Sequence, residues 1–272
     1  MMRPNSPVLT HSLLGAILAL ALAGALLPAQ AEPAALCTDR PTKSTGTCTA
    51  DDGHVQIESD LVSFSQSHEG AVTATTWVLL NPTIKYGVTE SLDVEAAAAL
   101  AVESRTTSTH TRDSTSGMGD LYLKLKQRFA LNPTTDLAVM PVVKLPTARH
   151  GVGNGAVEWG LLTPLIVRLN DDWTLNLSPE IDRLKNVSGS GYHTASAQLV
   201  NLGRSLPHDL SLSIEWWSGW DSDPSGSTRQ ASFDVGLAWL ASRDIQWDIG
   251  INRGLNAATP RVQAYLGVAK RY

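Results

Sequence analysis

Apolar and polar residues alternate along most of the chain from about residue 55 onward, and this alternation is the feature that most limits its fold. The clearest stretch is 244–253, where Ile245, Trp247, Ile249 and Ile251 alternate with polar or small residues. Successive side chains of a strand point to opposite faces, whereas a helix would spread these four residues around its circumference. The chain is therefore predicted to be all-β.

Twelve segments show this strand pattern, and each is long enough to cross a bilayer as a tilted strand, which takes about 9–11 residues. They are 55–66, 74–86, 91–103, 118–130, 135–146, 157–169, 173–185, 193–204, 209–219, 229–241, 244–253 and 262–271. The connections between them alternate in length. Short turns lie at 87–89, 132–134, 170–172, 207–209 and 242–243, and longer polar loops at 67–73, 104–117, 147–156, 186–192, 220–228 and 254–261.

An even number of strands, with short turns at one end and long loops at the other, is typical of a transmembrane up-and-down β-barrel. A soluble β-sandwich would show the same residue pattern, but it does not require the regular alternation of loop lengths. The last residue, Tyr272, is aromatic and follows a strand, as is common in outer-membrane barrels. We therefore predict a transmembrane antiparallel β-barrel of about twelve strands over residues 55–272, located in a bacterial outer membrane.

The first 31 residues have the organisation of a secretory signal peptide. Arg3 precedes an uncharged apolar run over 13–28, and Ala29-Gln30-Ala31 offers a cleavage site between small residues. A membrane anchor is the alternative, but the run is shorter than the about 20 residues of a spanning helix. The prediction of export agrees with an outer-membrane location and implies an oxidising compartment.

Residues 32–54 form a polar segment between the signal peptide and the first strand. The segment holds both cysteines of the chain, Cys37 and Cys48, which we expect to form a disulfide after export. It could extend into the periplasm, or it could fold into the barrel as a plug. Of these two placements we expect the periplasmic extension.

Charged residues occupy strand positions opposite the apolar ones. A charge that faces lipid costs a few kcal/mol near the middle of the bilayer, so these side chains are expected to point into the lumen. The candidate lumen-lining residues are Glu58, Asp60, Lys85, Asp93, Glu95, Lys124, Lys126, Arg128, Lys144, Arg168, Glu180, Asp182, Glu215, Asp234 and Asp248. They form a structural network of ion pairs, a polar path for a solute, or both. With twelve strands, a narrow or partly obstructed lumen is expected.

The eight tryptophans mostly lie near strand ends, where an aromatic girdle would meet the lipid headgroups. Three of them, Trp216, Trp217 and Trp220, cluster just before the long loop at 220–228. This clustering suggests that one or two of the three line an entrance for an aromatic compound.

Several short sequences are more specific than the alternation of apolar and polar residues. They are NPTIKYGVTE at 81–90, GMGDL at 117–121 followed by Lys124, PVVKLPT at 141–147, DIG at 248–250 and GLN at 254–256. Together they resemble the outer-membrane channel family named for the meta-pathway of phenol degradation, over residues 55–272. The chain departs from the family pattern at Ala148, where Gly is usual, and at Tyr272, where Phe is usual. The resemblance implies an outer-membrane barrel that passes hydrophobic or aromatic compounds.

Other functional classes find little support in the sequence. The formal net charge of -5 argues against a nucleic-acid partner. Outer-membrane phospholipases carry His-x-Ser-Asn-Gly on a strand, and the nearest stretch here, His193-Thr194-Ala195-Ser196-Ala197, has a different spacing. The histidines at or beside long loops, His68, His110, His150 and His193, have no sequence spacing that indicates a metal site.

The sequence therefore predicts a passive, narrow channel for small hydrophobic or aromatic solutes, with outer-membrane lipid as its surroundings. No catalytic residue, metal or cofactor is predicted. The alternatives are a structural or adhesive barrel that conducts nothing, and a barrel enzyme that modifies lipid. The oligomeric state stays open.

Overall fold

A computed structural model describes residues 35–272, so the predicted signal peptide over residues 1–31 lies outside the described residues. The strands are β1 (Val55–Glu69), β2 (Val72–Thr89), β3 (Leu92–Ala97), β4 (Ala101–Thr107), β5 (Arg112–Gly117), β6 (Leu121–Asn132), β7 (Thr135–Leu145), β8 (Glu158–Leu162), β9 (Leu165–Arg168), β10 (Trp173–Lys185), β11 (Tyr192–Leu206), β12 (Leu210–Asp221), β13 (Thr228–Ser242), β14 (Ile245–Gly254) and β15 (Val262–Arg271). Within the described range, no helix has the length and hydropathy of a membrane span.

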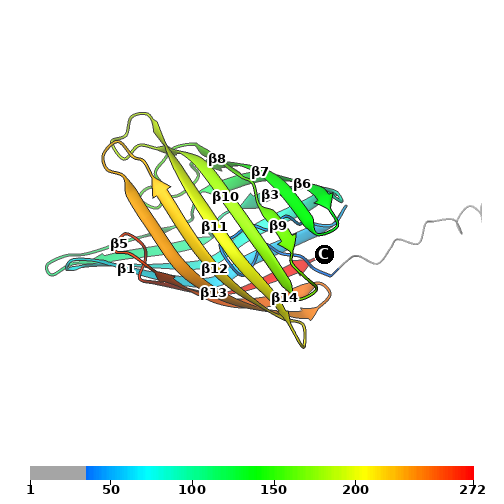
Figure 1. Cartoon of the computed structure of the whole chain (residues 1–272). Helices are drawn as coiled ribbons and strands as arrows, with labels where there is room; N and C mark the ends of the chain where they lie inside the picture. Colours follow the sequence, from blue (N-terminus) through cyan, green and yellow to red (C-terminus); the bar gives the residue numbers. More distant parts are fainter. Residues whose placement is uncertain (1–34) are drawn as a thin grey trace, which may run out of the picture. The chain divides into compact units, whose positions relative to one another are not determined.

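The strands form one antiparallel sheet that closes into a barrel. Strands β10 to β15 each pair with their neighbours in the chain, and β1 pairs with both β2 and β15, which closes the sheet. Figure 1 shows the strands steeply inclined around the barrel, with the C-terminus at one end. The pairing of β1 with β2 and β15 joins the two ends of the wall, so the backbone N–H and C=O groups along it find partners within the sheet, while β5 pairs with β4 alone.

The fifteen strands of the described region correspond to the predicted twelve, because three of the twelve are interrupted. β3 and β4 pair with successive parts of β2, and β8 and β9 both pair with β7 and β10. The third interruption separates β5 from β6, which pair with β4 and β3. Buried Pro164 lies in the gap between β8 and β9, where its missing N–H removes a ladder hydrogen bond.

Two of the predicted long loops are wrong. The loop expected at 67–73 is a tight turn at Gly70 and Ala71, because β1 and β2 continue to it. Most of the loop expected at 104–117 is a hairpin of β4 and β5. These extensions are rich in Ser, Thr and charged residues and are exposed on both faces, so they lack the apolar alternation that marked the other strands.

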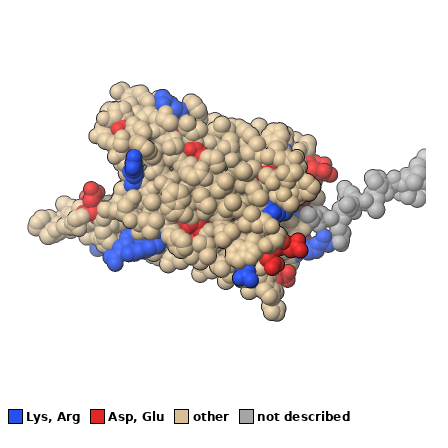
Figure 2. Space-filling view, in the orientation of Figure 1, with Lys and Arg blue, Asp and Glu red and all other residues tan. Residues whose placement is uncertain are grey.

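The wall is apolar outside and polar inside. Along β14, Ile249 and Ile251 are 56% and 53% exposed, while Asp248 and Asn252, which flank them in the sequence, are each only 3% exposed. The buried side chains of the described region are accordingly mostly polar or charged, the reverse of a soluble domain. In the view of Figure 2 most of the wall is uncharged, and the larger groups of charged side chains lie toward its ends.

Exposed aromatic residues stand in two zones along the wall. Trp239 and Trp247 are cross-strand partners close to the short-turn end of β13 and β14. Trp216 pairs with Phe233 nearer the opposite end. Aromatic rings at two depths are what the two interfaces of a bilayer select in barrels.

Placing a charge on the outer face should destabilise the barrel. Ile249→Lys puts an ammonium group in the middle of β14 on the apolar side, and we expect a loss of about 2–4 kcal/mol in the free energy of unfolding. Urea titration of protein folded into vesicles measures this, with heat-modifiable migration as the sign of a folded barrel. The control is Leu255→Lys, because exposed Leu255 lies beyond the end of β14. Equal losses in the two variants would contradict an apolar band around the wall.

Candidate functional site in the barrel lumen

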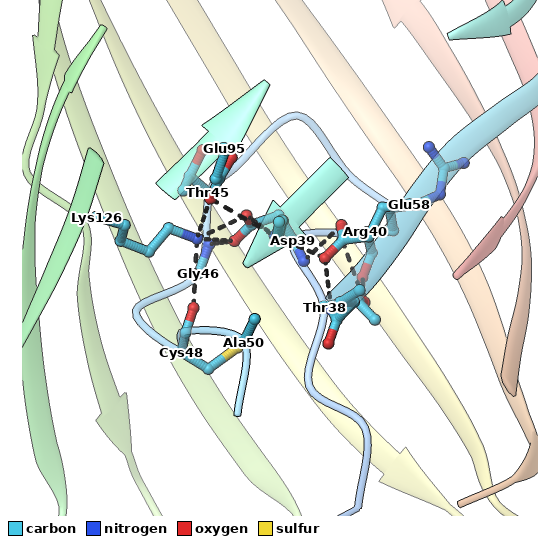
Figure 3. Close-up of polar contacts among 12 residues, drawn as sticks. Thr38, Asp39, Arg40, Thr45, Gly46, Cys48, Ala50, Glu58, Glu95 and Lys126 are labelled. Carbon is cyan, nitrogen blue, oxygen red and sulfur yellow. Dashed lines mark hydrogen bonds and ion pairs between the residues drawn. The ribbon is translucent and has the colours of Figure 1, made fainter. Parts of the chain in front are cut away.

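Residues 37–50, which we call the plug, run inside the barrel. Side chains from β1, β2, β3, β6 and β10–β14 hydrogen-bond to this segment from all around the wall. In Figure 3 the segment crosses the space enclosed by the strands, with Lys126 reaching toward it. The expectation that residues 32–54 extend into the periplasm is therefore wrong for the plug. The physical reason is that its polar groups satisfy charges that the wall buries.

Both ends of the plug lie at the same end of the barrel. On one side Leu36 donates its N–H to the carbonyl of Arg243, in the turn between β13 and β14. On the other side Gly53 donates to the carbonyl of Gly87, close to the turn between β2 and β3. The predicted disulfide between Cys37 and Cys48 is present and joins the two arms of the plug. The plug is thus a cross-linked loop inserted from the short-turn end.

Asp39 is the centre of the most buried charge cluster. The Nζ of Lys126 lies 2.9 Å and 2.6 Å from its two carboxylate oxygens, and the Nζ of Lys85 contacts the same carboxylate. Gly46 donates its N–H to Asp39 at 2.7 Å, which folds the plug around this carboxylate. Glu58 accepts the N–H of Asp39 at 3.1 Å and lies 2.6 Å from Lys85.

The charges around Asp39 keep it ionised. Burial alone would raise the pKa of this carboxyl, but Lys126 and then Lys85 outweigh burial and hold the pKa well below its usual range. The side chain of Lys126 is fully buried, so it depends on this counter-charge inside the barrel. Asp39 therefore fastens the plug to β2 and β6 at once.

Arg40 fastens the plug to β14 and β1. Its Nε and one terminal nitrogen form a bidentate pair with Asp248 on β14, at 2.9 Å and 2.6 Å, and the other nitrogen lies 2.7 Å from Asp60 on β1. Burial would lower the pKa of the guanidinium, but Asp248 and then Asp60 raise it above its usual value. The guanidinium also lies 5.8 Å from the ring centre of Tyr265.

The apex of the plug contacts β12 and β13. Lys43 reaches Asp234 at 2.9 Å and lies 4.8 Å from the ring centre of Trp217. The carboxylate of Glu215 accepts the backbone N–H groups of Lys43 and Ser44, at 3.1 Å and 3.0 Å. A carboxylate that accepts two backbone donors acts here as a cap for a turn of the plug.

Glycines in the wall make room for the plug. A Cβ at Gly236 on β13 would lie 2.6 Å from Cγ of Pro41, and a Cβ at Gly267 on β15 would overlap the guanidinium of Arg40. Any larger side chain at these positions would occupy space that the plug fills. The wall and the plug are therefore complementary in shape as well as in charge.

The structure divides the fifteen predicted lumen residues into three groups by location. Those that contact the plug or hold its partners are Glu58, Asp60, Lys85, Asp93, Glu95, Lys126, Glu215, Asp234 and Asp248. At the short-turn mouth, Arg128 and Arg168 both pair with Asp136. Toward the other mouth are Lys124, Lys144, Glu180 and Asp182, of which Lys144 lies 2.7 Å from Glu158.

Sequence reasoning missed the plug residues and several of the wall's carboxylates. Asp39, Arg40 and Lys43 lie in a segment without strand periodicity, so alternation could not place them. Asp136 and Glu158, in contrast, alternate with outward apolar residues in β7 and β8, and this signal could have found them.

Open spaces lie on both sides of the plug. At the short-turn mouth, a cavity of about 770 Å³ is lined by the disulfide, Arg128 and Arg168. Beyond the plug, cavities of about 410 Å³ and 210 Å³ share Glu180 in their lining, and Trp217 lines the smaller one. Of the clustered tryptophans, Trp217 and the exposed Trp220 both line this smaller cavity, whereas Trp216 is exposed on the wall. The plug lies between the space at the short-turn mouth and the two spaces beyond it.

Comparison with known proteins gives one family and a set of related folds. A family model described as "Putative MetA-pathway of phenol degradation" matches residues 38–272. An outer membrane channel from Pseudomonas putida F1 superposes with a TM-score of 0.66 at 15% identity, covering 86% of this chain and 99% of that one. The translocator domain of the autotransporter NalP from Neisseria meningitidis gives 0.52 at 12% identity, covering 96% of each chain. The NanC porin gives 0.50 at 8% identity, covering 79% and 98%. No curated protein sequence matches the chain.

Removing the charge of Asp39 should loosen the plug. Asp39→Asn leaves two buried ammonium groups without their shared counter-charge, a change that costs about 3 kcal/mol for a buried pair. If the plug moves as a unit, this cost corresponds to a roughly hundredfold larger open fraction. Single-channel recording measures the fraction. The control is Glu103→Gln, which removes a half-exposed partner of Arg105 outside the lumen. Unchanged gating in Asp39→Asn would contradict an anchoring role.

Filling the space behind Pro41 should displace the plug without altering any charge. Gly236→Val is expected to expose Lys43 to trypsin in the folded barrel, and cleavage after Lys43 is read by mass spectrometry after reduction. Gly203→Val on β11 is the matched control, because the nearest atom to a Cβ there is 3.8 Å away. Equal protection of Lys43 in both variants would show that the plug does not depend on the space at Gly236.

Proposed function

The chain belongs to the family described as the MetA-pathway of phenol degradation, and from this membership and the plugged lumen we propose that it is a passive outer-membrane channel. Small hydrophobic or aromatic solutes would enter the open mouth and move down their gradient when the plug shifts. Such transport uses no cofactor. The residues before the described region would serve export, in line with the predicted signal peptide.

The observation that carries this proposal is the way in which the plug is held. Its contacts to the wall are largely hydrogen bonds and ion pairs between polar groups, and the side chains of Arg40 and Lys43 are still 14% and 27% exposed. Water can replace such contacts far more easily than it can replace a packed apolar core. The plug can therefore leave its position while the hydrogen-bonded wall stays closed.

The lipid-modifying alternative would require a nucleophile beside a base. His193 on β11 lies between Asp221 and Asp223, at 2.9 Å and 3.2 Å. The hydroxyl of Ser225 donates to Asp223 at 2.5 Å rather than to His193. An Asp–His pair without a serine on the histidine does not form the relay that acyl transfer needs, and this arrangement favours the channel.

A non-conducting structural barrel is separated from a channel by removing the plug. We propose planar-bilayer recording of the full chain and of a variant that lacks residues 37–50, each shown to be folded by heat-modifiable migration. The variant should conduct several times more current than the full chain. A second arm compares uptake of a labelled single-ring compound by intact cells with and without the protein. Absence of conductance in both forms would refute the channel.

The variant without the plug should also prefer cations. At the level of the plug the wall then presents seven carboxylates and two lysines. They are Glu58, Asp60, Asp93, Glu95, Glu215, Asp234 and Asp248, with Lys85 and Lys126. A lumen with excess negative charge concentrates cations. The reversal potential in a gradient of KCl measures the preference, and a potential that indicates anion selectivity would contradict this prediction.

A further inference from the structure

We propose that His193 is the centre of a pH-sensitive latch, which holds two loops of the long-loop mouth together while the imidazole is protonated and releases them when it becomes neutral. The loops are residues 186–191, between β10 and β11, and residues 222–227, between β12 and β13. Both lie at the end of the barrel remote from the C-terminus (Figure 1). The latch consists of the side chains of Asn186, His193, Asp221 and Asp223. It does not depend on the proposed function.

The imidazole of His193 contacts both loops at once. His193 lies near the start of β11, and its side chain is only 5% exposed. Its Nε2 is shielded from solvent and lies 2.9 Å from a carboxylate oxygen of Asp221, at the end of β12. Its Nδ1 lies 3.0 Å from Oδ1 of Asn186 in the first loop and 3.2 Å from Asp223 in the second.

The three oxygen atoms next to the ring nitrogens are all acceptors. Two belong to carboxylates, and the third is Oδ1 of Asn186, whose side-chain nitrogen donates to the carbonyl of Ser190 at 2.6 Å. A neutral imidazole has one N–H and would turn a bare lone pair toward one of these acceptors, whereas an imidazolium donates from both nitrogens. The surroundings of His193 therefore suit the charged ring.

Asp223 is the constant member of the latch. It accepts the N–H of Val187 at 2.9 Å from the other loop, and the hydroxyl and N–H of Ser225 at 2.5 Å and 2.7 Å within its own loop. These hydrogen bonds, first from the Ser225 hydroxyl and then from the two N–H groups, lower the pKa of Asp223 to about 2. Asp223 thus stays ionised between about pH 5 and 8, where histidines change their charge.

The basic residues at the end of β10 point away from the latch. Arg183 donates to the hydroxyl of Thr194 at 2.8 Å and to the carbonyl of Tyr192 at 3.1 Å, and Lys185 lies 5.1 Å from the ring centre of Tyr192. Because Tyr192 and Thr194 flank His193 along β11, their side chains lie on the opposite face of the sheet. Both cations of β10 are therefore on the outer side of the wall.

The other charged groups around the latch are acidic or engaged elsewhere. Glu158 on β8 pairs with Lys144 at 2.7 Å, and Arg229 on β13 lies 4.2 Å from the ring centre of Trp220. Asp182 lies on the inward face of β10 and lines the cavity of about 210 Å³. Among the described residues, no lysine or arginine forms an ion pair with either carboxylate of the latch.

The direction of the switch follows from these contacts. Below the range in which His193 titrates, the charged ring pairs with Asp221 and Asp223 and joins the two loops. As the pH rises through that range, the ring loses one donor and its charge, and the hydrogen bond from Val187 to Asp223 remains. Since Asp221 also lines the cavity of about 210 Å³, the latch borders the outer part of the lumen.

The distance between the two loops tests the latch without any measurement of conduction. Val187→Cys and Ser227→Cys place one nitroxide label on each loop, at exposed positions, in the full chain folded into lipid vesicles. Labelling without reductant leaves the disulfide between Cys37 and Cys48 intact. Double electron–electron resonance then measures the distance at about pH 5 and about pH 8.5, on either side of the histidine range.

We expect a narrow distribution of distances at about pH 5 and a broader, longer one at about pH 8.5. His193→Gln should give the broad distribution at both pH values, and Asp221→Asn should move the transition to lower pH. His110→Gln, in the exposed turn between β4 and β5, is the matched control and should respond as the parent does. Heat-modifiable migration shows that each variant is folded. The same distribution at both pH values in the parent, or a pH response that survives in His193→Gln, would overturn the latch.

Discussion

A closed sheet with an apolar outer face leaves its polar side chains only one place to point. Along β14, Ile249 and Ile251 face outward, and Asp248 and Asn252 have nowhere to go but the interior. The same rule holds around the wall, so the lumen collects buried charges of both signs, and carboxylates exceed lysines at the level of the plug. Each such charge needs a partner or water, and the rest of the interior follows from this requirement.

The plug supplies partners for these buried charges with only a few side chains. Asp39 pairs with Lys85 and Lys126, Arg40 pairs with Asp60 and Asp248, and Lys43 pairs with Asp234. The same contacts that stabilise the interior therefore also close it. Pairing with the charges of the wall and filling the lumen are thus one interaction.

The sequence predicted the structure where the alternation of residues indicates which way a side chain points, and it failed where no such alternation exists. Alternation placed the strands and the inward charges, since a residue two positions away in a strand must share its face. It failed for the β4–β5 hairpin, where both faces are exposed and nothing selects apolar residues. It also failed for Asp39 and Arg40, whose partners are up to 208 residues away, because tertiary pairing of isolated charges leaves no local pattern.

The chain enters and leaves the lumen through the same mouth, so the plug is attached to the barrel at one end. Residues 51–54 link the plug directly to β1 at the short-turn end, where Gly53 bonds to Gly87. A plug released from its site would stay tethered at this mouth, so its return would be an intramolecular step rather than a new encounter.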